Sequence, residues 1–307
     1  MSDANIYLGS RGDDFRELIT ELLRRGNLKP KYIEQLTSKK AMQAFGVAFT
    51  AASADPVNNY ERFEQIGDVT ANKFIVWYAY RRFPQLDCTA GVKVVARLRI
   101  NYGAKATFAQ IADDLGFWDY ISCAIDGDQR NVKYRNRHKK DLLEDVFEAF
   151  VGCTEYLLDK AYMPGVGYGI VYNILSSIFD DISISLRYDD LFDAKTRLKE
   201  TFDLFADLGE WAFINRRTEP NEDGHTMSES SLYIVPVGES KMPIREKYGP
   251  GKRDFTEKPR RGWKRIGSAL APKKSDAEQL AAEQGLQYLK SKGYYRHPPK
   301  EYQLFCN

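Results

Sequence analysis

Apolar residues recur with a helical period from residue 10 to residue 181. In the first segment, residues 10–26, one stripe contains Phe15, Ile19 and Leu22, and Gly26 ends the pattern. The same period predicts further helices over residues 33–52, 60–83, 92–100, 108–115, 141–160 and 168–181. Because no alternating strand pattern appears in this region, the pattern predicts an all-α domain.

The pattern changes after a polar run at residues 183–190. A helix is predicted to begin at Asp193, followed by short strands over residues 211–217, 232–237 and 263–269 and by a long closing helix. The stretch 238–262, between the second and third strands, is rich in Lys, Arg, Pro and Gly, which predicts a flexible basic insertion. The second region is therefore a small α+β domain with the order α-β-β-β-α.

Length and composition limit the class of protein. A chain of 307 residues with 43% hydrophobic residues indicates two globular domains. No segment approaches the apolar length of a membrane span, and residues 1–6 lack the basic start and apolar run of a secretory signal. The four cysteines show no paired spacing. We expect a protein without membrane association that is not secreted, in the cytoplasm or another intracellular reducing compartment.

Charge is unevenly distributed along the chain. The formal net charge is only +2, yet residues 241–300 contain 16 Lys and Arg residues against 6 Asp and Glu residues. A basic C-terminal third behind a more acidic first domain indicates a module that binds a polyanion. A basic surface that is merely solvated is the alternative reading of the charge alone.

Two of the predicted helices carry acids among apolar residues, and in the 60–83 segment apolar residues such as Val69 and Trp77 predict a helix that is buried on most sides. Glu61, Glu64 and Asp68 fall within roughly 60° of one another on the helix that begins the 60–83 segment. Asp145 and Glu148, spaced i, i+3, project side by side from the 141–160 helix. Two such helices packed together would bring four or five carboxylates to one place.

Carboxylates in apolar surroundings need a compensating charge, because removing an ion from water costs several kcal/mol. A hard divalent cation such as Mg²⁺ or Mn²⁺ is a natural partner, since it prefers oxygen ligands. For either acidic pair alone, a solvated carboxylate or one at a helix N-terminus is the simpler explanation. The presence of both clusters favours a metal site.

These acids lie in motifs that resemble those of a known family. Residues 61–68 read Glu-Arg-Phe-Glu-Gln-Ile-Gly-Asp, which closely resembles the Glu-Arg-Leu-Glu-Phe-Leu-Gly-Asp signature of ribonuclease III. Residues 145–149 read Asp-Val-Phe-Glu-Ala and resemble its second acidic motif, Asp-x-x-Glu-Ala, while residues 82–84 match its Arg-Phe-Pro. The resemblance covers approximately residues 31–181, in the same order and with the same spacing.

The resemblance implies a metal-dependent endoribonuclease that cuts double-stranded RNA as a homodimer, with Mg²⁺ as cofactor and Mn²⁺ as a substitute. It implies products with 5′-phosphates and short 3′ overhangs, formed by hydrolysis in which one metal activates water and a second stabilises the departing 3′-oxygen. The implied catalytic and metal-binding residues are Glu64, Asp68, Asp145 and Glu148, with Glu61 as a further metal residue that orients ligands and supports the dimer edge.

The second region resembles a double-stranded RNA-binding domain. Its closing helix reads Ala-Glu-Gln-Leu-Ala-Ala-Glu-Gln over residues 277–284 and is preceded by two lysines. Lysines at a helix N-terminus add ammonium groups to backbone N–H donors, a combination that binds phosphates. The resemblance therefore implies RNA contacts by Lys273 and Lys274, by Thr196, Lys199 and Glu200 on the first helix, and by His225 between the first two strands.

Several positions depart from the ribonuclease III pattern. Gln65 replaces an aromatic residue that helps two subunits interlock, and Tyr60 replaces Asn. Cys88 stands where the family places an acid, with Asp87 adjacent. We expect a weakened or differently packed dimer whose buried apolar surface includes Phe63 and Ile66.

The second domain departs as well. Ser275 and Asp276 occupy positions that are commonly basic in such domains. Either affinity for RNA is lower or the basic insertion compensates, and the sequence leaves both possibilities open.

The predicted organisation has five parts: an N-terminal helical extension over residues 1–26, an endonuclease domain over 27–183, a linker over 184–190, an RNA-binding domain over 191–296 with an insertion at about 238–262, and a tail over 297–307. The competing function is a catalytically inactive relative that sequesters duplex RNA or has a structural role. Full retention of the acids favours the enzyme.

Overall fold

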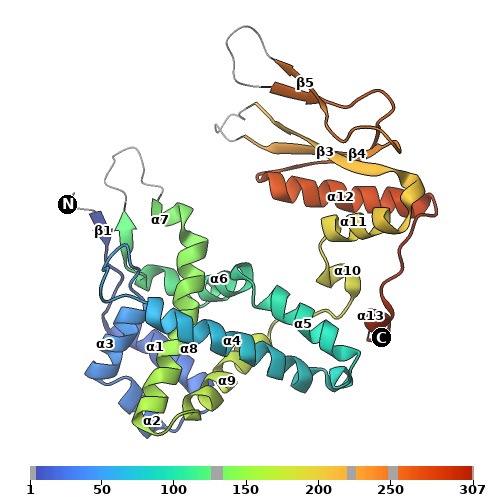
Figure 1. Cartoon of the computed structure of the whole chain (residues 1–307). Helices are drawn as coiled ribbons and strands as arrows, with labels where there is room; N and C mark the ends of the chain where they lie inside the picture. The colour runs from blue at the N-terminus through green and yellow to red at the C-terminus, as the bar shows by residue number, and fades with distance from the viewer. Residues whose placement is uncertain (1–4, 126–133, 220–225, 248–254, 306–307) are drawn as a thin grey trace. The chain divides into compact units, whose positions relative to one another are not determined.

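The computed structural model describes residues 5–125, 134–219, 226–247 and 255–305 (Figure 1). The chain divides into two compact units, Met1–Ile184 and Ser185–Asn307. This division falls at the beginning of the predicted linker. No helix among the described residues is both long enough and apolar enough to cross a lipid bilayer.

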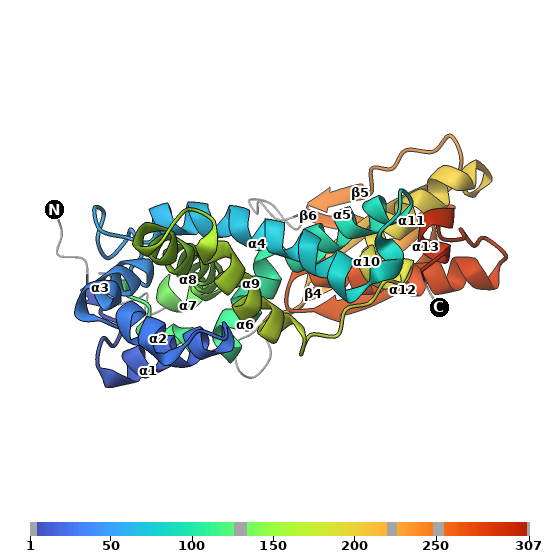
Figure 2. The same cartoon turned by 90° about the horizontal axis from the view of Figure 1, so that it is seen from below.

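The N-terminal unit is built from helices around one apolar core rich in phenylalanine. Its helices are α1 (Asp13–Arg25), α2 (Pro30–Leu36), α3 (Lys39–Ala48), α4 (Glu61–Arg82), α5 (Gly91–Tyr102), α6 (Lys105–Asp114), α7 (Tyr134–Arg137), α8 (Lys139–Ala161) and α9 (Val166–Phe179). Helices α4 and α8 lie side by side at its centre (Figures 1 and 2). Helix α1, predicted as a separate extension, contributes Phe15, Ile19, Leu22 and Leu23 to the same core.

The prediction of an all-α first domain needs a small correction. Strands β1 (Asn5–Tyr7) and β2 (Cys123–Ile125) form a two-stranded antiparallel ribbon. Arg11 fixes the chain beside it by donating from its guanidinium to the carbonyl oxygens of Tyr120 and Phe49 and to Ser122 Oγ. Three-residue strands are too short to show an alternating pattern, and their pairing depends on a contact between distant segments.

Helix α4 is less buried than its apolar sequence predicted. Its core face contains Phe63, Gly67, Ala71, Phe74 and Tyr78, which follow one another at helical spacing. Val69 and Trp77, predicted to be buried, are 65% and 58% exposed because they lie outside that face. Phe63, which was predicted to lie in a dimer interface, is 1% exposed within the core, whereas Ile66 is half-buried.

The C-terminal unit has a three-stranded antiparallel sheet with strand order β3-β4-β7. Its elements are α10 (Tyr188–Leu191), α11 (Ala194–Leu204), β3 (Glu210–Arg217), β4 (Ser228–Val235), β5 (Ile244–Lys247), β6 (Phe255–Lys258), β7 (Lys264–Ala271), α12 (Lys274–Ser291) and α13 (Lys300–Gln303). Helices α11 and α12 cover one face of the sheet and share a core with Leu232 and Ile266 (Figure 1). Along the chain, α11 precedes all five strands described in this unit and α12 follows them, with the β5–β6 pair between β4 and β7.

The stretch predicted as a flexible basic insertion contains an antiparallel pair of strands, β5 and β6. Strand β6 lies near β3, where Arg216 Nη2 donates to the carbonyl oxygen of Glu257. A second small core of Ala212, Ile214, Val235 and Trp263 also forms in this unit. Composition alone did not predict these strands because each has only four residues.

Candidate active site

The crossing of α4 and α8 brings the two acidic motifs together. A Cβ atom placed on Gly67 would lie 1.8 Å from the carbonyl oxygen of Glu148, and one placed on Gly152 would lie 2.0 Å from that of Phe63. Only glycine permits this approach of two helix backbones. The local sequence therefore determines how close Glu64 and Asp68 on α4 come to Asp145 and Glu148 on α8.

The carboxylates at this crossing perturb one another. The pKa of Glu148 is raised to about 8, first by burial and then by the negative charges of nearby acids, namely Asp68, Glu144, Glu64 and Asp145. Burial likewise raises the pKa of Glu64 to about 7, with further contributions from Asp145, Glu144 and Glu61. Each of the five predicted acids thus lies within electrostatic reach of Glu64 or Glu148, with Glu61 at the exposed edge.

The acids of this cluster differ in how they are held. Asn72 Nδ2 donates to Asp68 Oδ1 at 2.8 Å, and Tyr60 Oη donates to Asp145 Oδ2 at 2.6 Å. Glu148 is only 6% exposed. Within the described residues, Glu64 and Glu148 receive neither a hydrogen bond nor an ion pair. Glu148 therefore carries a desolvation cost that no described protein group offsets, whereas at Glu64 the charge of Lys105 opposes part of it.

Two residues next to the cluster were not predicted from sequence. Glu144 is one helical turn before Glu148, and its carboxylate pairs with Lys105 Nζ at 2.5 Å. Lys105, at the start of α6, also contacts Asp141 Oδ1 at 3.0 Å. The i, i+4 spacing from Glu148 could have indicated Glu144. No sequence spacing relates Lys105 to the acids, because it reaches the cluster only through packing of α6 on α8.

The donor atoms of the cluster suit a hard divalent cation, since all are carboxylate oxygens and Glu148 has no counter-charge among the described residues. In the part of the chain that the structure describes, no three or more His, Cys, Asp or Glu side chains are placed so that they could hold a metal ion as they stand. The fit to a metal thus rests on donor chemistry and uncompensated charge. Asp87, the predicted substitute at Cys88, is not among the charges that raise the pKa of Glu64 or Glu148.

The predicted RNA-contacting residues lie in different environments in the C-terminal unit. Lys273 and Lys274 are at the exposed start of α12, where Lys274 Nζ lies 3.7 Å from Glu278. Thr196 Oγ1 donates to Asp193 Oδ2 at the start of α11, and Lys199 is exposed. His225 lies outside the described residues.

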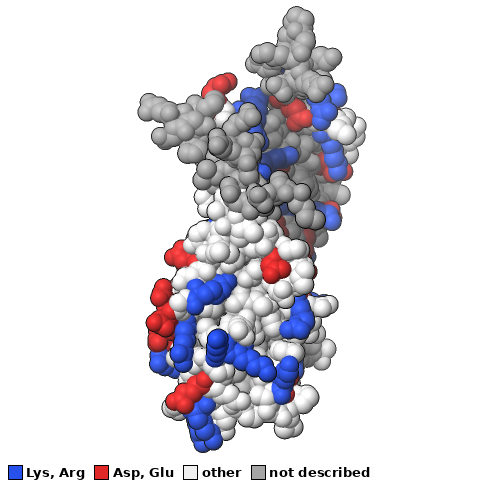
Figure 3. Space-filling model, turned by 90° about the vertical axis from the view of Figure 1, so that its left-hand side faces the viewer, with Lys and Arg blue, Asp and Glu red and all other residues white. Residues whose placement is uncertain are grey.

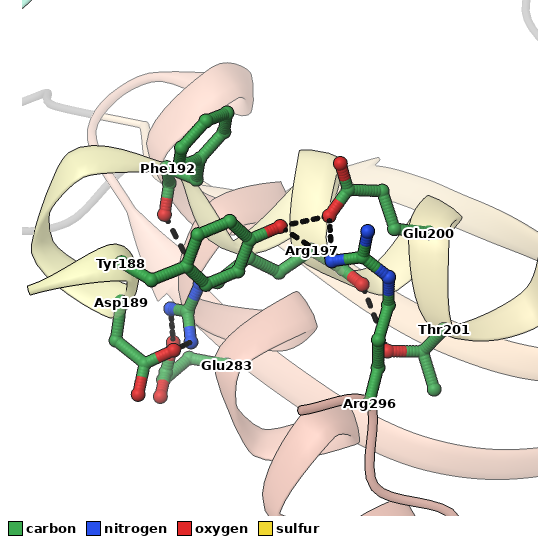
Figure 4. Close-up of polar contacts among 8 residues, drawn as sticks. All are labelled: Tyr188, Asp189, Phe192, Arg197, Glu200, Thr201, Glu283 and Arg296. Carbon is green, nitrogen blue, oxygen red and sulfur yellow. Dashed lines mark hydrogen bonds and ion pairs between the residues drawn. The ribbon is translucent and has the colours of Figure 1, made fainter. Parts of the chain in front are cut away.

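Glu200, also predicted to contact RNA, is held inside the unit (Figure 4). Its carboxylate accepts a hydrogen bond from Tyr188 Oη and pairs with Arg296 Nη1 at 2.7 Å, while Arg296 also donates to Tyr188 Oη at 2.8 Å. These groups line a cavity of about 140 Å³ beside Arg197, whose guanidinium pairs with Glu283. The resemblance could not reveal this arrangement, because Arg296 comes from the segment after α12.

Charge on the molecular surface is mixed in the view that Figure 3 gives. On the described residues seen there, basic and acidic side chains are interspersed over uncharged surface. A continuous track of one sign would be needed to identify a phosphate-binding surface from charge alone. Charge on the described residues of this face therefore does not identify an RNA-binding surface.

A Ribonuclease III domain profile matches residues 61–157, the segment that contains both acidic motifs. The chain is 43% identical over 208 residues to a protein assigned as ribonuclease 3 in Invertebrate iridescent virus 6, covering 64% of this chain and 68% of that protein. It is 42% identical over 193 residues to the corresponding protein of Frog virus 3, covering 62% of this chain and half of the longer viral protein. It is 31% identical over 176 residues to ribonuclease 3 of Lactobacillus johnsonii, covering 57% of this chain and 70% of that enzyme.

Proposed function

The chain belongs to the ribonuclease III family, and from this premise we propose that it is a metal-dependent endoribonuclease that hydrolyses double-stranded RNA. The observation that carries the proposal is the set of carboxylates at the α4–α8 crossing. Glu148 is buried there with its pKa raised to about 8 and with no cation among the described residues to offset it. A site that concentrates uncompensated negative charge is suited to binding a divalent cation.

In the proposed site, Glu64, Asp68, Asp145 and Glu148 supply oxygen ligands for Mg²⁺, with Mn²⁺ as a substitute. When bound, the ion makes a coordinated water acidic enough to act as a nucleophile and neutralises charge on the phosphate. Asn72 holds the orientation of Asp68, and Lys105 pairs with Glu144 and Asp141 beside the site.

The proposed reaction is hydrolysis of one phosphodiester bond. The oxygen of water bonds to phosphorus and the bond from phosphorus to the 3′-oxygen breaks, which leaves a 5′-phosphate and a 3′-hydroxyl. A cut in both strands with a short 3′ overhang requires two sites at a set distance, and a two-fold homodimer supplies them. Gln65, Val69 and Trp77 on the exposed side of α4 are available for such an interface.

We assign duplex binding to the C-terminal unit, in which the sheet and helices follow the α-β-β-β-α order of a double-stranded RNA-binding domain. Lys273 and Lys274 at the start of α12 and Lys199 on α11 are exposed and carry the charge that phosphate contacts need. Glu200 is not included, because Tyr188 and Arg296 hold its carboxylate within the unit.

Cleavage of a long RNA duplex tests the catalytic proposal. The full chain should cut duplex RNA with Mg²⁺, should leave single-stranded RNA largely intact, and should lose activity in EDTA. Products should carry 5′-phosphates, which a phosphate-dependent exonuclease detects. Tight duplex binding without Mg²⁺-dependent cleavage would instead establish the non-catalytic function.

Truncation tests the assignment of RNA binding. A chain ending at Ile184 retains the whole N-terminal unit with its own core. It should cut duplex RNA at low salt but bind roughly 10-fold or more weakly at physiological salt, with a shallower dependence of log affinity on log salt. An unchanged salt dependence would show that the C-terminal unit is not the RNA-binding element.

A further inference from the structure

Tyr60 is fixed immediately before the helix that carries three of the acids. Its backbone N–H donates to the carbonyl oxygen of Thr50 at 2.9 Å, and its own carbonyl accepts from the N–H groups of Phe63 and Glu64 in the first turn of α4. The side chain is only 8% exposed. Both the backbone and the ring of Tyr60 are therefore held in place before any ligand binds.

The hydroxyl of Tyr60 reaches from α4 to α8. Tyr60 Oη lies 2.6 Å from Asp145 Oδ2, a short and charge-assisted hydrogen bond. The hydroxyl is the donor of this bond, because an ionised carboxylate oxygen can only accept. One oxygen of Asp145 is thus engaged by a fixed partner.

The remaining acids show why this contact matters. Asp68 has an orienting donor in Asn72, whereas Glu64 and Glu148 have none among the described residues. A cluster of carboxylates that repel one another tends to spread apart, and a ligand set works only if its members keep their orientation. Tyr60 and Asn72 each hold one acid, one on each of the two helices.

On the basis of the proposed function, we propose that Tyr60 is a positioning residue that holds Asp145 by Oδ2 and leaves Oδ1 as its metal-binding oxygen. The residue acts through Asp145 and does not itself contact RNA or the ion. Orienting partners of metal ligands typically contribute about 10- to 100-fold to metal affinity, so removal of the hydroxyl should weaken metal binding by a similar factor.

A matched pair of variants isolates this role. Tyr60→Phe removes only the hydroxyl. Tyr78→Phe removes an equivalent hydroxyl from the same unit, where buried Tyr78 donates to Asp180 Oδ1 at 2.7 Å, away from the acid cluster. Mn²⁺ binding to each RNA-free protein is measured by the electron paramagnetic resonance signal of free Mn²⁺. Melting curves in EDTA set an assay temperature at which both variants are folded.

We expect Tyr60→Phe to bind Mn²⁺ at least about 10-fold more weakly than wild type, with Tyr78→Phe unchanged. In cleavage assays, the Mg²⁺ concentration for half-maximal rate should rise in Tyr60→Phe while the rate at saturating Mg²⁺ stays close to wild type. If the Tyr60 hydroxyl only stabilised the fold, both variants would change alike. The Mg²⁺ concentration for half-maximal rate would then not rise separately from a fall in the rate at saturating Mg²⁺.

Three outcomes would overturn the inference: wild-type Mn²⁺ affinity in Tyr60→Phe, an equal loss in both variants, or no Mn²⁺ binding by wild type. The last outcome would also remove the metal site from the proposed function. By contrast, Mn²⁺ binding that depends on Tyr60 in a protein that does not cut RNA would refute the proposed activity and uphold the role of Tyr60.

Discussion

Buried carboxylates occur in both units, but their surroundings are opposite. In the C-terminal unit, Glu278 is 8% exposed and is contacted by Lys195 Nζ at 2.5 Å and Asn215 Nδ2 at 3.0 Å. In the N-terminal unit, Glu148 is 6% exposed and faces four other acids. The first environment supplies a cation and a hydrogen-bond donor to the carboxylate, whereas the second raises the pKa of Glu148 to about 8.

The difference separates a structural acid from a candidate functional one. Glu278 connects α12 to α11 and β3, so its charge contributes to folding of that unit. The Glu148 carboxylate forms no hydrogen bond or ion pair with any described residue. Its ionised form therefore opposes folding unless a cation is bound. Burial alone does not distinguish a candidate site, whereas burial of a carboxylate among other acids and without a cation does mark one.

The largest expected effect comes from neutralising the unpaired acid. Glu148→Gln keeps the shape of the side chain but removes a proposed metal-ligand charge, so the cleavage rate should fall by roughly 100-fold or more. Duplex binding, measured by filter retention, should stay near the wild-type level. In EDTA the variant should melt at a higher temperature than wild type, because one of the repelling charges is gone.

The matched control for this variant is Glu283→Gln, which removes the charge of an acid paired with Arg197 in the C-terminal unit. Its cleavage rate should remain close to wild type. Wild-type turnover in Glu148→Gln at millimolar Mg²⁺ would contradict the assignment of the site.

A smaller effect should follow from removing the paired acid. Glu278→Ala leaves Lys195 and Asn215 without their carboxylate partner, which should cost about 1–3 kcal/mol of stability in the C-terminal unit. Native-state hydrogen exchange resolves the two units and should show faster exchange in the C-terminal unit only. Replacing the exposed Glu239 with Ala should change exchange little, and equal effects of the two substitutions would show that the Glu278 contacts contribute nothing.

The sequence predicted those features that depend on local spacing. The five acids lie on α4 and α8 because i, i+3 and i, i+4 spacings place side chains on one face of a helix, whatever the helix packs against. The three central strands, β3, β4 and β7, overlap the predicted segments for the same reason, since alternation is a property of the strand itself.

Features that depend on contacts between distant segments were not predicted. Lys105 meets Glu144 only because α6 packs on α8, and Arg296 meets Glu200 only because the segment after α12 returns to α11. The exposure of Trp77 has a similar origin, because apolar residues on all sides of a helix do not reveal which sides the fold covers. Local patterns therefore located the acids of the candidate site but not the cation beside it.

The last expected effect is a difference in how stability depends on pH. Folding raises the pKa of Glu64 to about 7 and that of Glu148 to about 8, from an ordinary value of 4.5. Between about pH 4.5 and pH 8 the folded protein therefore binds more protons than the unfolded chain, and these two groups lower the free energy of unfolding as pH rises. Wild type in EDTA should lose stability across this window more steeply than Glu148→Gln, because other titrating groups are shared and cancel in the difference.

Urea unfolding of both proteins at several pH values measures this difference in free energy of unfolding. Parallel curves would show that ionisation of Glu148 costs no stability. Saturating Mn²⁺ should flatten the wild-type curve, since a bound cation favours the ionised carboxylates that low pH removes.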